Sequence, residues 1–164
     1  MGSKMADHKI KILIIDDEKN IRLTLRDILE DDGHLVVEAG TGEDGLELLK
    51  IESVNLVLLD VRLPGMDGIE TIRRLNEMDL EISPQPIMVT AYGTHEISED
   101  AERVGIRATL TKPVNASQLF DAAVVALGGE STRTEVSVEQ GVSSEELKPV
   151  LGARVLLTED NLLN

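Results

Sequence analysis

One stretch of the chain constrains the fold more than any other. In residues 56–60, four consecutive apolar residues run directly into a single acid, Asp60, and a Pro64-Gly65 turn follows shortly afterwards. An apolar run without polar alternation is typical of a strand that is buried on both faces, as in a parallel sheet covered by helices. Because open parallel sheets bind their ligands at the carboxyl ends of the strands, Asp60 stands where chemistry is expected.

The same kind of segment recurs along the chain and alternates with helical patterns. We predict strands over residues 9–15, 35–37, 56–59, 87–90 and 108–111. We predict helices from an Asn20 cap to Gly33, over 43–51, from 67 or 68 to 75, over 95–104 and over 117–127. This alternation predicts an α/β fold: a doubly wound, five-stranded parallel sheet in the flavodoxin-like order 2-1-3-4-5, with helices on both faces.

The chain after residue 128 has a different composition. Residues 129–152 are rich in Ser, Glu, Gly and Thr, which predicts a flexible linker. Residues 153–164 repeat the pattern of the first predicted strand: a basic residue, strand-like positions and then two acids. We therefore expect residues 1–8 to be a tag or N-terminal tail, residues 9–128 to form one domain, and residues 153–164 to be the first strand of a second, truncated copy.

Composition argues against several classes of function. The formal net charge is −15 and the only aromatic residues are Tyr92 and Phe120, so direct binding of a nucleic acid is not expected. The chain has no cysteine, which excludes disulfides and thiolate metal sites. No apolar run is long enough to span a bilayer, so we expect no membrane contact in this fragment and a cytoplasmic location.

Polar side chains follow four of the predicted strands. Asp16 and Asp17 end the first, Asp60 ends the third, Thr90 ends the fourth and Lys112 follows the fifth. Three carboxylates within ~5 Å of one another repel by roughly 3 kcal/mol per pair at an effective dielectric near 20, so such a cluster favours a bound cation. Oxygen-only ligands suit Mg²⁺ or Mn²⁺, and such a metal is suited to phosphoryl transfer.

Five short motifs carry a resemblance to a known family. The motifs are Ile15-Asp16-Asp17, Leu59-Asp60, Leu63-Pro64-Gly65-Met66-Asp67-Gly68, Val89-Thr90-Ala91 and Thr111-Lys112-Pro113. In their order and spacing, the chain resembles the receiver domain of two-component response regulators over about residues 9–128. Each motif is weak by itself, and the five together are highly specific.

The resemblance implies a metal site. Asp17 and Asp60 would bind Mg²⁺ through their side chains, and the backbone carbonyl of Arg62 would be a third ligand. Asp16 would act through a water molecule. The resemblance also implies that the Lys112-Pro113 bond is often cis.

The resemblance also implies a reaction and a partner. Asp60 would accept a phosphoryl group from a phosphohistidine on a histidine kinase or a histidine phosphotransfer domain, and slow self-dephosphorylation would follow. Thr90 would bond the phosphoryl group and report its presence. Lys112 would pair first with the acceptor and then with the phosphate.

One position departs from the family pattern. Receivers usually carry Tyr or Phe three residues before the lysine, where the ring acts as a switch, and this chain has Thr109 there. The nearby aromatic residue, Tyr92, lies two residues after Thr90 on the next predicted loop. An aromatic flip at the fifth strand is therefore not expected, although phosphorylation itself is.

Later segments resemble the tandem receivers of hybrid sensor histidine kinases. They are residues 90–93, 112–121 and 152–161, whereas the first half of the chain is more similar to a stand-alone regulator. The second receiver is thus an expected partner in the same chain, and the chain would belong to the cytoplasmic portion of a membrane-bound sensor. The sequence leaves the oligomeric state open, with a dimer as one option.

Other interpretations compete with these assignments. The string Gly40-Thr-Gly42-Glu-Asp-Gly45 matches a dinucleotide-binding pattern, but Glu43 and Asp44 would repel a pyrophosphate at the helix N-terminus. His8, His34 and His95 follow no ligand spacing and are expected at the surface.

Two further alternatives concern the chemistry of Asp60. A degenerate receiver would be a docking module that needs no phosphate. A hydrolase of the haloacid dehalogenase type would need Asp-x-Asp, which Asp60-Val-Arg62 lacks.

The pair Arg73-Arg74 is expected to be a solvated helix face.

Overall fold

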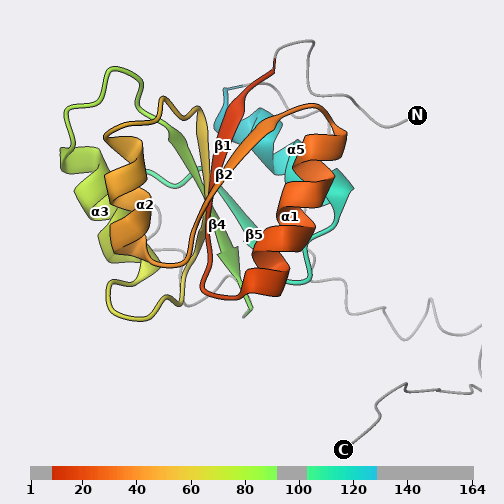
Figure 1. Cartoon of the computed structure of the whole chain (residues 1–164), viewed down its shortest axis with the longest axis horizontal. Helices are drawn as coiled ribbons and strands as arrows, with labels where there is room; N and C mark the ends of the chain where they lie inside the picture. The colour runs from red at the N-terminus through yellow and green to blue at the C-terminus, as the bar shows by residue number, and fades with distance from the viewer. Residues whose placement is uncertain (1–8, 92–102, 129–164) are drawn as a thin grey trace, which may run out of the picture. The chain divides into compact units, whose positions relative to one another are not determined.

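A computed structural model describes residues 9–91 and 103–128 (Figure 1). Four expectations therefore lie outside the described residues: the tail at 1–8, Tyr92, the linker at 129–152 and the second copy at 153–164. The helix expected over 95–104 lies almost entirely outside them as well.

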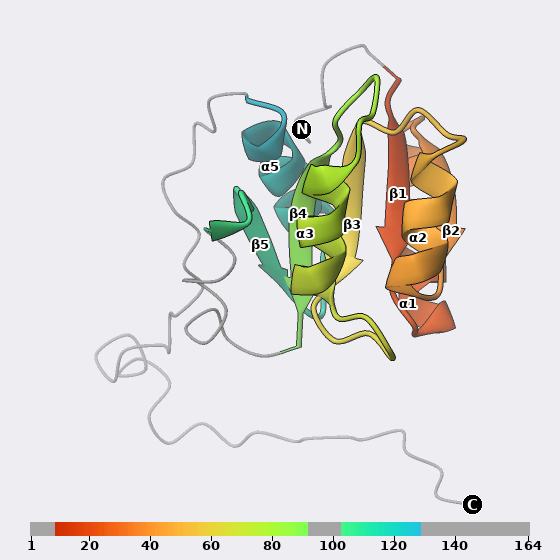
Figure 2. The ribbon, with the colours of Figure 1, turned by 90° about the vertical axis from the view of Figure 1, so that its left-hand side faces the viewer.

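The described residues contain a five-stranded parallel sheet. Its strands are β1 (Lys11–Ile15), β2 (Leu35–Ala39), β3 (Leu56–Asp60), β4 (Gln85–Thr90) and β5 (Ala108–Thr111). They lie in the order β2-β1-β3-β4-β5, which Figure 2 shows side by side. Each neighbouring pair is parallel, which confirms the predicted fold class and strand order.

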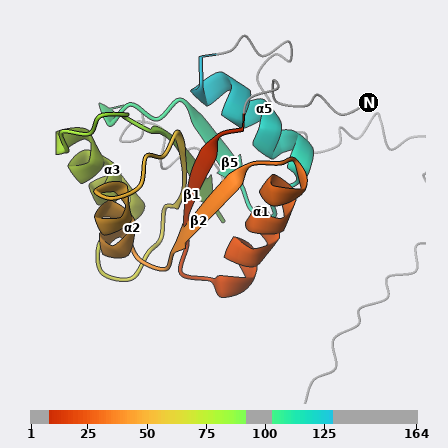
Figure 3. The same cartoon turned by 45° about the horizontal axis from the view of Figure 1, so that its top comes forward.

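Helices cover both faces of this sheet. The described helices are α1 (Lys19–Asp31), α2 (Gly42–Leu49), α3 (Gly68–Glu77) and α5 (Ala116–Ala126). In Figures 1 and 3, α1 and α5 lie on one face and α2 and α3 on the other. Right-handed crossovers of parallel strands produce this two-sided arrangement.

The strands feed two apolar clusters because successive side chains point to opposite faces. Ile12 and Ile14 of β1 belong to the cluster under α1 and α5, whereas Leu13 and Ile15 belong to the cluster under α2 and α3. All five residues of β3 are buried, as expected for a central strand without polar alternation. Burial of the strands on both faces fixes their register, and with it the side chains at their ends.

Side-chain caps begin three of the described helices, but not α1. Thr41, Asp67 and Asn115 each accept a hydrogen bond from an amide three residues later. The prediction that Asn20 caps α1 is wrong. The N-cap is Glu18, whose carbonyl accepts from the amides of Ile21 and Arg22, and Asn20 lies in the first turn.

Several strands are longer than predicted. β2 continues to Ala39 and β3 includes Asp60. β4 begins at Gln85 rather than at residue 87, so Pro86 is a buried strand residue. Proline is tolerated there because β4 pairs with β5 only from Ile87 onward.

His34 is also placed differently from the prediction. Its exposed fraction is 6%, so it is buried rather than at the surface. Its Nδ1 accepts from the Ile10 amide at 3.5 Å and its Nε2 lies 3.2 Å from Asp32 Oδ2. By contrast, Arg73 and Arg74 form the expected solvated face, where both contact Glu70.

None of the helices in the described ranges is long and apolar enough to cross a membrane.

Candidate functional site

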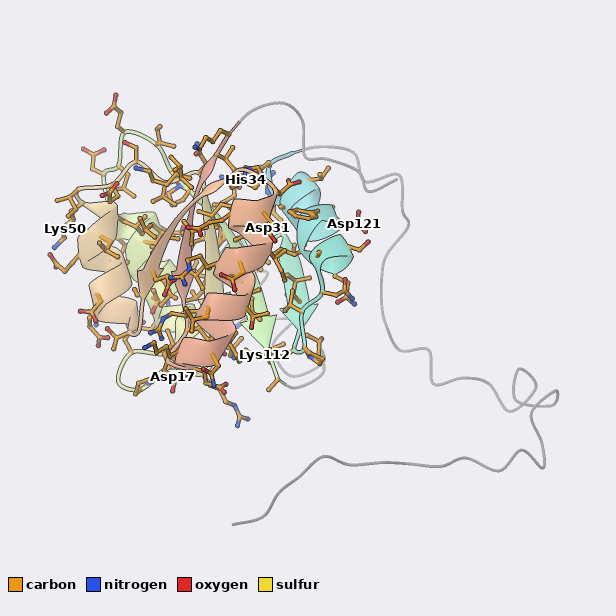
Figure 4. All side chains as sticks on the ribbon, turned by 45° about the vertical axis from the view of Figure 1, so that its right-hand side comes forward. Asp17, Asp31, His34, Lys50, Lys112 and Asp121 are labelled. Carbon is orange, nitrogen blue, oxygen red and sulfur yellow. The ribbon has the colours of Figure 1, made fainter. Side chains whose placement is uncertain are left out.

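Four strands deliver polar side chains to one edge of the sheet. Asp16 follows β1, Asp60 ends β3, Thr90 ends β4 and Lys112 follows β5. Asp16, Asp60 and Thr90 are only 1%, 6% and 3% exposed, although each carries a polar side chain. Figure 4 shows Asp17 and Lys112 at this end of the sheet and His34 at the other. The structure therefore brings the predicted strand-end residues to one edge.

The three acids form a compact cluster. Asp16, Asp17 and Asp60 each offer a carboxylate oxygen, and these oxygens lie within 4.8 Å of one another. Asp16 and Asp60 are buried, whereas Asp17 is exposed. The cluster is thus open to solvent on the side of Asp17 and closed beneath Asp16 and Asp60.

Lys112 lies against the two buried acids. Its Nζ donates to Asp60 Oδ2 at 2.8 Å and lies 2.8 Å from Asp16 Oδ2. Burial by itself lowers the pKa of Lys112, but the close contacts with the Asp16 and Asp60 carboxylates outweigh it and hold that pKa above its ordinary value. Lys112 is therefore a fixed cation at neutral pH.

Asp16 is buried, and burial disfavours the charged form of its carboxyl group. Burial raises the pKa of its carboxyl group, and the contacts with Lys112 and with the Glu18 amide only partly oppose this effect. Its Oδ1 accepts from the Glu18 amide at 2.8 Å. Its contact with Lys112 is an ion pair without hydrogen-bond angles, so Oδ2 keeps capacity for another ligand.

The loop after Asp60 folds back onto that residue. The Arg62 amide donates to Asp60 Oδ1 at 3.1 Å, which fixes the rotation of the carboxylate. A side chain at Gly68 would place its Cβ 2.5 Å from the Asp60 carbonyl oxygen, so only glycine allows α3 to begin this close to β3. The predicted role of the Arg62 carbonyl stays a prediction.

The donor set fits a hard divalent cation. Three carboxylates with one open side provide oxygen ligands and leave positions for water, which is the preference of Mg²⁺ and Mn²⁺. A single ammonium does not balance three acids, and the Asp16 oxygen without a hydrogen bond faces the same cluster. The residues present therefore fit the metal that the sequence predicted.

The position expected to hold an aromatic switch is Thr109, in β5. It is half-buried and lies opposite Met88 of β4 in register. The Lys112-Pro113 bond that follows β5 is cis, as the resemblance implied.

The glycine string before α2 has a packing explanation. A Cβ at Gly42 would lie 2.3 Å from the Thr71 hydroxyl oxygen, and one at Gly45 would lie 2.3 Å from Ile15 Cδ1. These glycines let α2 approach α3 and β1 closely. Glu43 and Asp44 lie in the first turn of α2, where their negative charges interact favourably with the helix dipole and would repel a bound phosphate.

Two residues at the site were missed by the sequence reasoning. Glu18 Oε1 lies 3.5 Å from Lys112 Nζ, and Arg22 Nη1 donates to the Asp16 carbonyl at 2.6 Å. Glu18 directly follows the two acids in the sequence, which is a local signal. Arg22 lies one helical turn beyond that loop, where an arginine is usually a solvated helix residue, so no sequence signal marks it.

Comparison with known proteins agrees with this geometry. A family model described as "Response regulator receiver domain" matches residues 12–124. Sporulation initiation phosphotransferase F of Bacillus subtilis is 35% identical over 112 residues, which cover 68% of this chain and 89% of that protein. Chemotaxis protein CheY of the same organism is 33% identical over 113 residues, covering 68% and 92%.

A solved structure shares the fold. The CheY-like receiver domain protein of Methanospirillum hungatei superposes with a TM-score of 0.64 at 34% identity, covering 71% of this chain and 91% of that one. Receiver domains bind Mg²⁺ through an acidic pocket and interact with histidine kinases or phosphotransfer partners, and the acidic cluster here is such a pocket. This chain belongs to the response regulator receiver domain family of two-component signalling proteins.

Proposed function

We propose that this domain accepts a phosphoryl group on Asp60 from a phosphohistidine of a histidine kinase or a histidine phosphotransfer domain. The observation that carries this proposal is the buried Asp60 carboxylate, held by Lys112 at 2.8 Å inside a three-acid cluster. A purely structural strand end would have no reason to keep this excess of buried charge.

The transfer is a single displacement at phosphorus. A carboxylate oxygen of Asp60 forms a bond to phosphorus while the bond to the donor imidazole nitrogen breaks. The electron pair of that bond stays on the imidazole, which takes up a proton. A Mg²⁺ ion held by these acids would neutralise the negative charge that develops during the transfer.

The residues around Asp60 have separate roles in this proposal. Asp17 and Asp60 hold the metal with the Arg62 carbonyl, and Asp16 acts through water. The Arg62 amide orients the acceptor carboxylate. Lys112 neutralises Asp60 before transfer and pairs with the phosphoryl group afterwards.

Phosphorylation then acts as a switch. It adds about −1.5 to −2 charge at pH 7, and a full two-state switch needs a bias of roughly 5.5 kcal/mol. Thr90 and Lys112 supply this bias, because Thr90 ends β4, the strand next to β3, and Lys112 contacts Asp60 directly at 2.8 Å. With Thr109 in place of an aromatic residue, the readout uses other groups.

We also propose that residues 129–152 link this domain to a second receiver that begins at residue 153, as in a tandem-receiver regulator or a hybrid kinase.

A direct test uses acetyl phosphate and Mg²⁺ on the full chain, followed by intact mass spectrometry. The parent protein is expected to gain one phosphoryl group, and Asp60→Asn is expected to reduce this gain by at least ~100-fold, since no other carboxylate replaces the nucleophile. Asp31→Asn is the matched control, because Asp31 is exposed at the far end of α1 and should leave the gain unchanged (Figure 4).

The alternative is a docking module that needs no phosphate. Beryllofluoride with Mg²⁺, which mimics a phosphoryl group, separates the two. Amide chemical shifts around Asp60 and Thr90 should change in the parent protein and stay unchanged in Asp60→Asn. Equal changes in both proteins would refute the acceptor role, and no change in either would favour the docking module.

A further inference from the structure

A half-buried arginine, Arg22, lies beside the acidic cluster and is not part of it. Arg22 Nη1 donates to the backbone carbonyl of Asp16 at 2.6 Å, and its side chain is 17% exposed. Its Nε lies 3.5 Å from Glu38 Oε2, on β2. One side chain of α1 thus connects the acidic loop to the neighbouring strand.

The carbonyl that Arg22 binds belongs to the peptide group between Asp16 and Asp17. Two other contacts fix Asp16: its amide donates to the Ala39 carbonyl at 3.2 Å and its Oδ1 accepts from the Glu18 amide at 2.8 Å. The hydrogen bond from Arg22 is a third contact, and it fixes the orientation of the Asp16 carbonyl. Because this peptide group leads into Asp17, its orientation decides where the exposed Asp17 carboxylate points.

Glu38 in turn fixes the guanidinium group. It accepts from Arg26 Nη1 at 2.9 Å while facing Arg22 Nε, so one carboxylate lies between two arginines. Arg26 lies one turn further along α1, where it contacts Glu38 and Asp27. Arg26 therefore provides a matched control: the same residue type on the same helix with the same acidic partner.

We propose that Arg22 is a positioning residue for cation binding, which holds the Asp16-Asp17 peptide group so that both carboxylates face one metal ion, and that Glu38 orients Arg22 for this role. The inference rests on the proposed Mg²⁺ site. Partners behind metal ligands typically change metal affinity by 10–100-fold when they are removed.

Charge alone predicts the opposite effect of removing Arg22. A guanidinium near the cluster repels Mg²⁺, so its loss without any change in geometry would tighten Mg²⁺ binding. Positioning predicts weaker binding. The pair Arg22→Met with Glu38→Gln leaves the net charge unchanged and removes the electrostatic contribution from the comparison.

The test is calorimetric titration of the full chain with Mg²⁺, with urea unfolding in metal-free buffer as a check of the fold. Arg22→Met and the double variant should each bind Mg²⁺ about 10-fold more weakly than the parent. Glu38→Gln alone should weaken binding about 3-fold, and Arg26→Met should change it by less than about 2-fold. Arg22→Lys, which keeps the charge and one donor, should recover part of the loss.

The outcomes separate this inference from the proposed function. A parent protein that binds no Mg²⁺ would overturn the proposed metal site and this inference with it. A parent that binds Mg²⁺ while Arg22→Met binds equally or more tightly would overturn the inference alone. If Arg22→Met does not fold, Arg22→Lys decides, because it keeps the charge: weaker Mg²⁺ binding than the parent supports positioning, and equal binding overturns it.

Discussion

The two edges of the sheet, where its parallel strands begin and where they end, differ in how their charged groups are paired. At the edge where the strands begin, Lys11 pairs with Glu52 at 2.8 Å, so one cation faces one acid. Where the same strands end, Asp16, Asp17 and Asp60 cluster together, and the Lys112 ammonium lies 2.8 Å from the two buried acids among them.

This difference indicates that the edge where the strands begin stabilises the fold, whereas the edge where they end is suited to binding a ligand. A one-to-one pair such as Lys11 and Glu52 leaves no excess charge for a ligand to neutralise. An excess of buried carboxylate costs folding free energy, and a bound cation can offset that cost. Changes at the two edges should therefore separate stability from metal binding.

The largest effect is expected for Lys112→Met at the functional edge. Removing the ammonium leaves two buried carboxylates without a cation, which should lower the free energy of unfolding by about 2–3 kcal/mol at pH 7 without metal. Because the pKa of Lys112 lies above its ordinary value, its contribution is complete at neutral pH and is lost only as the pH rises through that raised value. Urea unfolding measures the loss.

Saturating Mg²⁺ provides the control for this variant. The cation can replace the missing positive charge, so the loss of stability should be smaller with Mg²⁺ than without it. An equal loss in both conditions would show that packing of the lysine stem, rather than its charge, stabilises this edge.

Asn55→Ala tests the other edge, with a smaller effect. Asn55 Oδ1 accepts from the Lys11 amide at 2.9 Å, and the Asn55 amide donates to the Lys11 carbonyl. Removing the side chain leaves a strand amide without its acceptor, which should cost about 1–2 kcal/mol. Mg²⁺ affinity should stay unchanged, and a loss of affinity would contradict the separation of the two edges.

The sheet and the main site residues could be predicted because their signals are local in the sequence. The apolar run before Asp60 indicates a strand buried on both faces, and a parallel sheet then brings strand ends together without any knowledge of side-chain contacts. Asp16, Thr90 and Lys112 were found in this way.

Contacts that depend on packing could not be predicted. The burial of His34 follows from its position against Ile10 and Asp32, and no spacing pattern encodes it. Pro86 is tolerated in β4 only because of how β5 pairs with that strand. Arg22 reaches the site through its long side chain from within α1, where an arginine is usually read as a solvated residue.

The smallest effect on stability is expected for Asp16→Asn. This variant should become more stable rather than less, which separates stability from metal binding most clearly. Because burial raises the pKa of Asp16, the folded state favours the neutral carboxyl, and asparagine imitates that neutral form. The unfolded chain loses this proton first as the pH rises above 3.8, so ionisation of Asp16 lowers stability between that value and the raised pKa. Asp16→Asn should therefore be roughly 1 kcal/mol more stable than the parent at pH 7 without metal.

The same substitution should weaken Mg²⁺ binding, because it removes one of the three charges that attract the cation. Urea unfolding at pH 4 and pH 7 should show the advantage of Asp16→Asn growing with pH, while calorimetry shows its lower Mg²⁺ affinity. A variant that loses both stability and affinity would mean that the ion pair with Lys112 outweighs burial at Asp16. The functional edge would then be held together by its charges rather than strained by them.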